Sequence, residues 1–316
     1  MAFRIYFVSD LHGSNKCFKK FVNSWKTYKA QALILGGDIT GKIIVPILTN
    51  PDGSYYCRFM EKQNIVRTEK ELTDLKELIA DTGYYPFMAT EEDIKALDSD
   101  NEIVKQKFRE LMTQRVRDWA AMVNERLKGT NIKCYISPGN DDDFSIDSAL
   151  RDDGLLINPE GRVVELDGGN EMITLGYSNK TPWNSPRETT EEDIQNRIDK
   201  MASKVHDMKK CVFNVHLPPY DTPLDKAPKL TPDLKPVLSA GNLELIPAGS
   251  TAVMNSIKEY QPLTGLHGHI HEARGYVKIG RTMCFNPGSD YTEGILKGLL
   301  LDLDGDKIKL HFFTSG

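Results

Sequence analysis

Short apolar runs, each followed at once by a loop of glycine and polar residues, constrain the fold of this chain more than any other feature. These runs lie at residues 3–8, 32–35, 132–136, 211–215 and 263–266. An apolar spacing typical of an amphipathic helix, over residues 17–28, separates the first two runs. Strand–helix–strand units of this kind favour parallel strands with right-handed crossovers. The pattern therefore predicts an α/β fold whose polar exit loops lie at one edge of a sheet.

The rest of the chain is expected to add an insertion, a long loop and further strands. Runs at 43–49 and 55–60 flank turn-forming residues, which predicts a hairpin, and helices are expected over 69–80, after Thr90 and over 101–127. We interpret 43–127 as an inserted hairpin and helical cap on a single domain spanning 1–316. Its aromatic cluster at 84–87 is either a lid contact or packed core. The segment 218–247, rich in Pro and Gly, is expected to form a lid-like loop. A further helix is predicted over 190–208, and strands are predicted over 163–166, 172–175, 277–279, 282–285, 296–303 and 308–313.

Composition excludes several classes of protein. The 316 residues include 40 Lys and Arg against 45 Asp and Glu, and the resulting net charge of -5 does not favour nucleic acid as a partner. Five single cysteines without a paired motif indicate reduced thiols and a cytoplasmic protein. No apolar run resembles a secretory signal or reaches the roughly 18 residues of a membrane span, so no membrane partner is expected.

Metal-binding side chains follow the predicted strands. Five of the seven histidines lie in strand-exit loops, most of them close to an Asp or Asn. Imidazole nitrogens with carboxylate or amide oxygens, and no thiolates, favour Mn, Fe or Zn over Mg or Ca. The candidate ligands are Asp10, His12, Asp38, Asn140, His216, His269 and His271.

These loops resemble the five ordered motifs of the calcineurin-like metallophosphoesterase family. The matching segments are Asp10-Leu11-His12, residues 36–41 (GGDITG), Gly139-Asn140-Asp141-Asp142, Val215-His216 and Gly268-His269-Ile270-His271, with a further signature at residues 286–289. The motifs span residues 10–289, so the resemblance covers nearly the whole chain. It implies a four-layer α-β-β-α sandwich of two mixed sheets, the metallophosphoesterase fold, with a largely helical insertion.

The resemblance also implies a reaction. Two divalent ions, with Mn²⁺ expected first and Fe or Zn as alternatives, would be the cofactors of a phosphoesterase. A metal-bridging hydroxide would attack a small phosphodiester or phosphomonoester substrate. The implied ligands are Asp10, His12 and His271 for one ion, Asn140, His216 and His269 for the other, and Asp38 as the bridge between them.

Asp141 departs from the family pattern, because many relatives have His directly after the Asn, where it stabilises the transition state or protonates the leaving group. A carboxylate there repels phosphate unless it is protonated or turned toward a metal-bound water, so the role is unfilled or moved. His267 is a possible substitute acid, and the alternative is that it only packs or forms hydrogen bonds behind the ligands. Asp141 and His267 are therefore the candidate catalytic residues. Asp142 is expected to orient a ligand or to cap a turn.

Two alternative functions remain open. One is a nuclease of the same fold, against which stand the negative charge and the lack of a basic, aromatic-rich tract. The other is a non-catalytic scaffold, in which metal ligands are usually eroded, whereas all seven positions are intact here. The sequence specifies neither the physiological substrate nor the oligomeric state.

Overall fold

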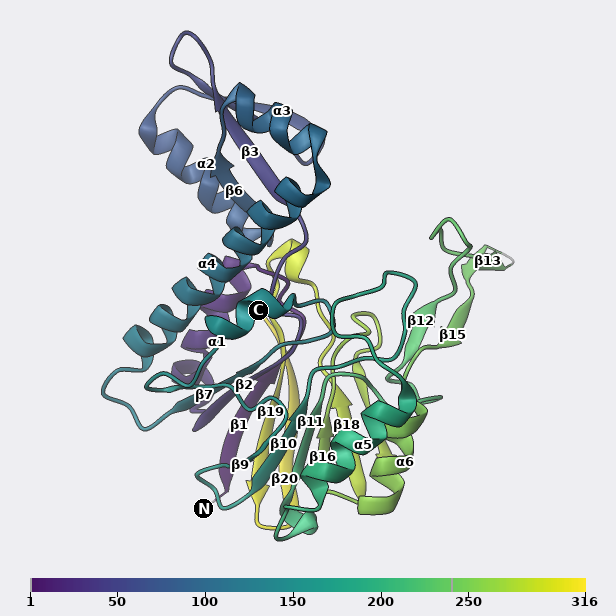
Figure 1. Cartoon of the computed structure of the whole chain (residues 1–316). Coiled ribbons are helices and arrows are strands. Elements are labelled where there is room, and N and C mark those ends of the chain that lie inside the picture. The colour runs from purple at the N-terminus through teal and green to yellow at the C-terminus, as the bar shows by residue number, and fades with distance from the viewer. Residues whose placement is uncertain (1, 240) are drawn as a thin grey trace.

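The computed structural model describes residues 2–239 and 241–316 and shows a mixed α/β fold, which confirms the predicted class (Figure 1). Two six-stranded sheets form its body. The first sheet has the order β20 (Lys307–Ser315), β19 (Lys297–Asp304), β1 (Phe3–Val8), β2 (Ala32–Gly36), β7 (Lys133–Ser137) and β8 (Leu156–Ile157). The second has the order β17 (Gly275–Ile279), β18 (Thr282–Asn286), β16 (Thr264–Leu266), β11 (Val212–Val215), β10 (Glu171–Leu175) and β9 (Val163–Glu165).

The strands that carry the motifs are parallel to their neighbours. In the first sheet β1, β2 and β7 pair in parallel, and in the second β10, β11, β16 and β18 do the same. These strands are almost wholly buried, as expected for strands covered on both faces. Parallel direction brings their carboxyl ends to one edge of each sheet, where the polar loops begin.

Apolar side chains hold the two sheets and their helices together. Phe7 of β1, Leu266 of β16 and Phe285 of β18 belong to one core between the sheets. Helices α1 (Asn15–Tyr28) and α4 (Asn101–Leu127) pack on the other face of the first sheet, where the rings of Phe18 and Trp119 stack at 3.9 Å. Helices α5 (Glu191–Ala202) and α6 (Thr251–Tyr260) pack on the second sheet (Figure 1).

Helix α5 ends earlier than the predicted 208. Thr190 caps its start, as expected, by accepting a hydrogen bond from the Asp193 amide. Beyond its end, the carboxylate of Glu171 accepts hydrogen bonds from the amides of His206 and Asp207. The amides of Lys204 and Val205 donate to the carbonyls of Met201 and Ala202, three residues back, so the helix gives way to a turn before these residues.

The segment 43–127 contains more sheet than predicted. The expected hairpin is present as β3 (Ile44–Thr49) and β4 (Tyr55–Phe59), and β5 (Lys62–Val66) and β6 (Tyr85–Met88) extend it to four strands. Helices α2 (Glu69–Asp81) and α3 (Glu91–Ser99) lie beside these strands, and in Figure 1 this part projects from the body at the top, whereas α4 runs from it down onto the first sheet. Tyr85 is 1% exposed and its hydroxyl accepts a hydrogen bond from the Gly41 amide, so this aromatic is packed core. The role of the segment as a cap stays a prediction.

The segment 218–247 forms paired strands rather than an open loop. β12 (Lys226–Pro228) pairs with β15 (Leu245–Pro247), and β13 (Leu238–Ser239) pairs with β14 (Asn242–Leu243), all antiparallel. An ion pair between Lys229 and Glu244 joins the two sides at 2.7 Å. Figure 1 shows this arm extending away from the body, and its lid role stays a prediction. Among the described helices, none is both long and apolar enough to cross a membrane.

Candidate metal centre

Strand exits from both sheets bring all seven candidate ligands together. Asp10 and His12 follow β1, Asp38 follows β2, Asn140 follows β7, His216 follows β11, and His269 and His271 follow β16. Five of the seven are buried, and only His269 and His271 are partly exposed. The ligands are therefore shielded from bulk solvent, and His269 and His271 are the most exposed of the seven.

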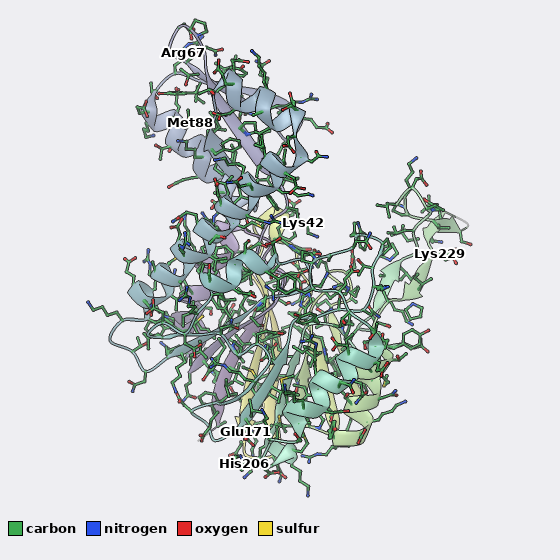
Figure 2. All side chains as sticks on the ribbon, in the orientation of Figure 1. Lys42, Arg67, Met88, Glu171, His206 and Lys229 are labelled. Atoms are coloured by element: carbon green, nitrogen blue, oxygen red, sulfur yellow. The ribbon has the colours of Figure 1, made fainter. Side chains whose placement is uncertain are left out.

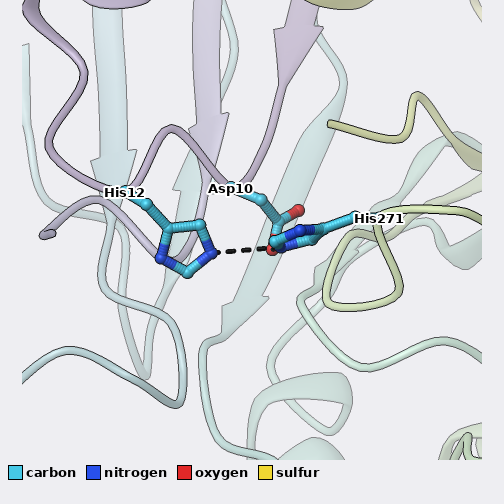
Figure 3. A group of neighbouring side chains, drawn as sticks. All are labelled: Asp10, His12 and His271. Atoms are coloured by element: carbon cyan, nitrogen blue, oxygen red, sulfur yellow. Dashed lines mark hydrogen bonds and ion pairs between the residues drawn. The ribbon is translucent and has the colours of Figure 1, made fainter. Parts of the chain in front are cut away.

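The first cluster consists of Asp10, His12 and His271 (Figure 3). The Nε2 atoms of His12 and His271 lie 3.1 Å apart, and His271 Nε2 lies 3.5 Å from Asp10 Oδ1. Figure 3 shows the two rings turned toward each other beside the Asp10 carboxylate. Two imidazoles and a carboxylate so close together form a donor set suited to a divalent transition-metal ion.

The second cluster consists of Asp38, His216 and His269. His216 Nε2 lies 3.5 Å from Asp38 Oδ1 and 3.8 Å from Asp10 Oδ1. His269 Nδ1 lies 2.8 Å from Asn140 Oδ1, which brings the Asn140 amide to the edge of the cluster.

Asp38 faces both clusters. Its Oδ1 lies 3.5 Å from His216 Nε2 in the second cluster, and its Oδ2 lies 3.7 Å from His12 Nε2 in the first. One carboxylate thus offers a separate oxygen to each cluster, which is the arrangement required of a bridging ligand.

The unpaired nitrogen of His216 shows that the residues fit a metal ion. His216 Nδ1 lies 2.9 Å from the Gly36 carbonyl and donates its proton there, which leaves Nε2 directed at Asp10 and Asp38. This buried Nε2 has no hydrogen-bond partner among the described atoms. A proton or a cation must lie at Nε2, because a lone pair facing two carboxylates would be repelled, and metal-ligating histidines are typically oriented by such a second hydrogen bond.

The carboxylates and His12 hold the protonation states that metal ligation needs. Burial raises the pKa of Asp10, but the hydrogen bond with His271 and the charge of His216 outweigh it and lower that pKa to about 2. Burial lowers the pKa of His12 to about 4. Burial also opposes the charged form of His216, yet the charges of Asp38 and Asp10 raise its pKa to about 10. His216 is therefore the ligand that must lose a proton when it binds a cation.

Left-handed backbone conformations position four of the seven ligands. The φ angles of Asp10, His12, Asp38 and His269 are 58°, 41°, 48° and 66°. Residues other than glycine seldom adopt such angles, and where they do, they cluster at functional sites. The conformations are held in place: the Asp10 amide donates to the Gly37 carbonyl at 3.0 Å, and the His12 amide donates to the Asp38 carbonyl at 2.9 Å.

A glycine leaves room for the second cluster. Gly37 has a φ of 118°, and a Cβ there would overlap His216 Nδ1. Only glycine fits without displacing the ring or breaking its hydrogen bond to Gly36. This glycine of the motif is thus explained by close packing against a ligand.

Asp142 orients the loops that carry the ligands. Its fully buried carboxylate accepts hydrogen bonds from the amides of Ile39, Thr40 and Gly139, at 3.0, 2.8 and 2.7 Å. It therefore ties the exit loop of β2 to that of β7, so that Asp38 and Asn140 are placed relative to each other.

The two candidate catalytic residues lie in different surroundings. Asp141 belongs to a third group with His12 and Asp38, and its amide donates to Asp38 Oδ1 at 3.0 Å. His267 belongs to none of these groups, and its Nδ1 lies 2.8 Å from the Val215 carbonyl. Burial lowers the pKa of His267 to about 4. This geometry favours the packing alternative for His267.

Three neighbours of the centre were absent from the sequence prediction. Lys42 forms an ion pair with Asp141, and the Ser185 hydroxyl donates to the same carboxylate. The Tyr291 ring lies 4.8 Å from that of His12 and 6.0 Å from that of His271. Lys42 follows the Asp38 motif directly and Tyr291 follows the 286–289 signature, so proximity to a motif could have indicated both. Ser185 has no such signal.

Comparison with known proteins identifies one curated relative, and no protein-family model matches the chain. The relative is an uncharacterized protein, MJ1162, from Methanocaldococcus jannaschii, 32% identical over 152 residues. The match covers 48% of this chain and spans 61% of the length of the relative.

Solved structures share the fold over the full chain. One crystal structure has a TM-score of 0.59 at 14% identity, covering 100% of this chain and 99% of the other. The protein TT1561 of Thermus thermophilus has a TM-score of 0.52 at 14% identity with the same coverage. An archaeal phosphodiesterase and the E. coli phosphoesterase Yfce, 11% and 12% identical, cover 98% of this chain and 99% and 98% of their own. Their TM-scores of 0.37 and 0.33 are too low to support an argument. The likeness to the first two structures shows a shared fold, and the two Asp/His clusters lie where the motifs that resemble those of metallophosphoesterases predict a metal site.

Proposed function

We propose that this chain is a dinuclear metal-dependent phosphoesterase that hydrolyses a small phosphodiester or phosphomonoester. The observation that carries the proposal is Asp38, whose two carboxylate oxygens face one Asp/His cluster each. We infer in addition that the two sheets and their outer helices form the four-layer order of the metallophosphoesterase fold.

The seven ligands divide into two sets around Asp38. Asp10, His12 and His271 would hold one ion, and Asn140, His216 and His269 would hold the other. When bound, the two ions would supply the Lewis acidity that activates water and offsets charge on the phosphoryl oxygens. The mixture of imidazole and oxygen donors fits Mn²⁺, with Fe and Zn as alternatives.

The ligands are largely buried, and the two partly exposed ones mark a side from which a substrate can approach. Asp10, His12 and His216 are each about 1% exposed, so bulk water does not surround the centre. The side chain of His271 is 31% exposed. A phosphate ester would therefore approach past His269 and His271, and a low-dielectric site of this kind strengthens electrostatic contacts with it.

A small ester is the substrate class that the chain supports best. The net charge of -5 does not favour a long polyanion, and metals at the buried centre would supply the positive charge that a single phosphate needs. A nuclease of the same fold and a non-catalytic scaffold are the alternative functions that the following test distinguishes.

The test is hydrolysis of p-nitrophenyl phosphate and bis(p-nitrophenyl) phosphate by the purified Mn²⁺-loaded chain, with metal content measured by elemental analysis. We expect about two ions per chain and turnover of at least one ester. Glu171→Gln serves as a control, because Glu171 pairs with His206 at the opposite end of the body from Lys42 (Figure 2).

Three other results would each contradict the proposal. Two bound ions without hydrolysis would favour the scaffold. Higher kcat/KM on an oligonucleotide than on either ester would favour the nuclease. Protein that binds no metal and shows no activity would contradict the metal centre itself.

A further inference from the structure

Lys42 lies at the edge of the metal centre and contacts the residue that departs from the family pattern. It precedes β3, and Figure 2 shows it at the base of the segment that projects from the body. Its ammonium group forms an ion pair with Asp141 Oδ2. Within residues 2–239 and 241–316, no other Lys or Arg forms an ion pair with a member of the three Asp/His groups.

Close packing fixes the backbone that presents Lys42. The Gly41 amide donates to the buried Tyr85 hydroxyl at 2.7 Å. A Cβ on Gly41 would overlap the Gly83 carbonyl oxygen, so the two backbones are in direct contact. The Lys42 side chain is nevertheless 57% exposed, which leaves its ammonium group accessible from solvent.

Asp141 is held between Lys42 and the metal ligands. Its Oδ1 accepts hydrogen bonds from the Ser185 hydroxyl and from Asn140 Nδ2, the latter at 3.1 Å. Its amide donates to Asp38 Oδ1 at 3.0 Å, and its side chain is only 16% exposed. These hydrogen bonds fix the position of Asp141 relative to the ligands, and they leave its Oδ2 to form the ion pair with Lys42.

The charge at this edge suits a phosphate. The carboxylates of Asp10, Asp38 and Asp141 repel a phosphate at the centre, and phosphoryl transfer places further negative charge on the phosphoryl oxygens. The positive charge of Lys42 opposes this repulsion. An ammonium group has three donors, and Asp141 is the one ion-pair partner that the structure gives Lys42. The other donors have no ion-pair partner in the described part of the chain, so they are available to a phosphate oxygen.

We propose that Lys42 contacts the substrate through a phosphate oxygen, and that Asp141 is a positioning residue that directs the Lys42 ammonium group. The inference rests on the proposed function, because it requires a phosphate ester at the metal centre. It also names the preferred substrate class. A phosphomonoester carries up to two negative charges and a diester carries one, so Lys42 favours the monoester.

The first test compares Lys42→Ala with Lys105→Ala. Lys105 is also 57% exposed and also ion-paired, to Glu102 on α4, so it is a matched control. Binding of inorganic phosphate to the Mn²⁺-loaded protein is measured by calorimetry, and kcat/KM is measured for both p-nitrophenyl esters. We expect Lys42→Ala to weaken phosphate binding and to lower kcat/KM for the monoester by about tenfold, with a smaller loss for the diester. Lys105→Ala should match the wild type in both.

The second test is Asp141→Asn, which removes the ion pair and one negative charge. We expect kcat to fall while phosphate binding is not weakened and the metal content is unchanged. A loss of metal would instead make Asp141 a ligand, which overturns its positioning role.

The possible failures can be told apart. If Lys42→Ala keeps wild-type phosphate binding and wild-type kcat/KM for the monoester, the role of Lys42 is overturned. The phosphoesterase proposal then stays intact. If the wild-type protein binds metal and phosphate but hydrolyses neither ester, the proposed function is contradicted. Weaker phosphate binding by Lys42→Ala would in that case still support the contact between Lys42 and phosphate.

Discussion

Binding of metal to the metal-free protein should release at least one proton at about pH 8, the one on His216, and a bridging water that ionises to hydroxide would add to this number. The Nδ1 proton of this ring is donated to the Gly36 carbonyl, so a second proton sits on Nε2, which faces Asp10 and Asp38. Burial opposes this charged form, but the two carboxylates raise the pKa of His216 to about 10. A metal ion at Nε2 takes the place of that proton.

The number of protons released follows from the pKa values of the ligands. At about pH 8, a group with a pKa of about 10 is about 99% protonated. Burial lowers the pKa of His12 and of His269 to about 4, so neither holds a proton to release. Burial also opposes the charged form of His271, but its hydrogen bond with Asp10 raises its pKa.

The proton count is measured by titrating Mn²⁺ in two buffers of equal pH and different ionisation enthalpy. The difference in observed heat gives the number of protons released, and the contribution of His216 should stay near one from about pH 7 to pH 9 and fall to about half near pH 10. His206→Ala is the control, because His206 is exposed and lies at the opposite end of the body from Lys42 (Figure 2). No release at saturating metal would refute the assignment of the Nε2 proton.

The same raised pKa makes the metal-free protein sensitive to alkali. A group whose pKa is higher in the folded state stabilises that state fully below its unfolded value, near 6.5. This stabilisation is lost as the pH rises toward the folded value of about 10. The free energy of unfolding of the chelator-treated protein should therefore decrease over this range, as measured by denaturant titration, and bound metal should suppress the decrease.

Further substitutions test the geometry of the centre. Asp38→Asn should lower kcat/KM by more than about 100-fold, since it alters the carboxylate that faces both clusters; full activity would show that the ligand assignment is wrong. Gly37→Ala would place a Cβ against His216 Nδ1, and it should weaken Mn²⁺ binding and lower the free energy of unfolding by about 2 kcal/mol. His267→Gln should leave kcat unchanged in the ester assay, because His267 lies outside the clusters; a large fall in kcat with normal metal content would restore it as an acid.

The strand exits were predictable because parallel strands obey simple rules. Residues 3–8 and 32–35 were expected to be strands, and they appear as β1 and part of β2, paired in parallel. Since the direction of the strands fixes where the loops of one sheet meet, the pattern itself indicated that Asp10 and Asp38 lie close together. His216, His269 and His271 follow strands of the second sheet, and their place in the ligand set came from the resemblance to the family motifs.

The strands outside this pattern were not predictable. β5 has the sequence KQNIV, with no alternation of apolar and polar residues, and β12 ends in a proline. Their pairing comes from backbone hydrogen bonds to a neighbouring strand, as between β4 and β5, and backbone bonding leaves little trace in side-chain type. The ion pair of Lys42 was likewise not predictable, because its partner Asp141 is 99 positions away and only the fold joins them, although the place of Lys42 after the Asp38 motif could have indicated that it lies near the centre.

The preformed backbone of the centre argues that the metals bind a site that is already built. Asp10, His12, Asp38 and His269 hold left-handed conformations, with φ between 41° and 66°, and each such residue costs of order 1–3 kcal/mol. Hydrogen bonds that involve no metal hold these loops: the His12 amide donates to Asp38, the His269 amide donates to Asp10, and Asp142 joins two of the loops. Because the interactions within the protein offset this strain, metal binding need not fold the loops and mainly replaces the proton on His216. At the edge of the centre, Lys42 is the one Lys or Arg that forms an ion pair with a member of the Asp/His groups in the described part of the chain, and it would add a fixed positive charge to that of the bound ions.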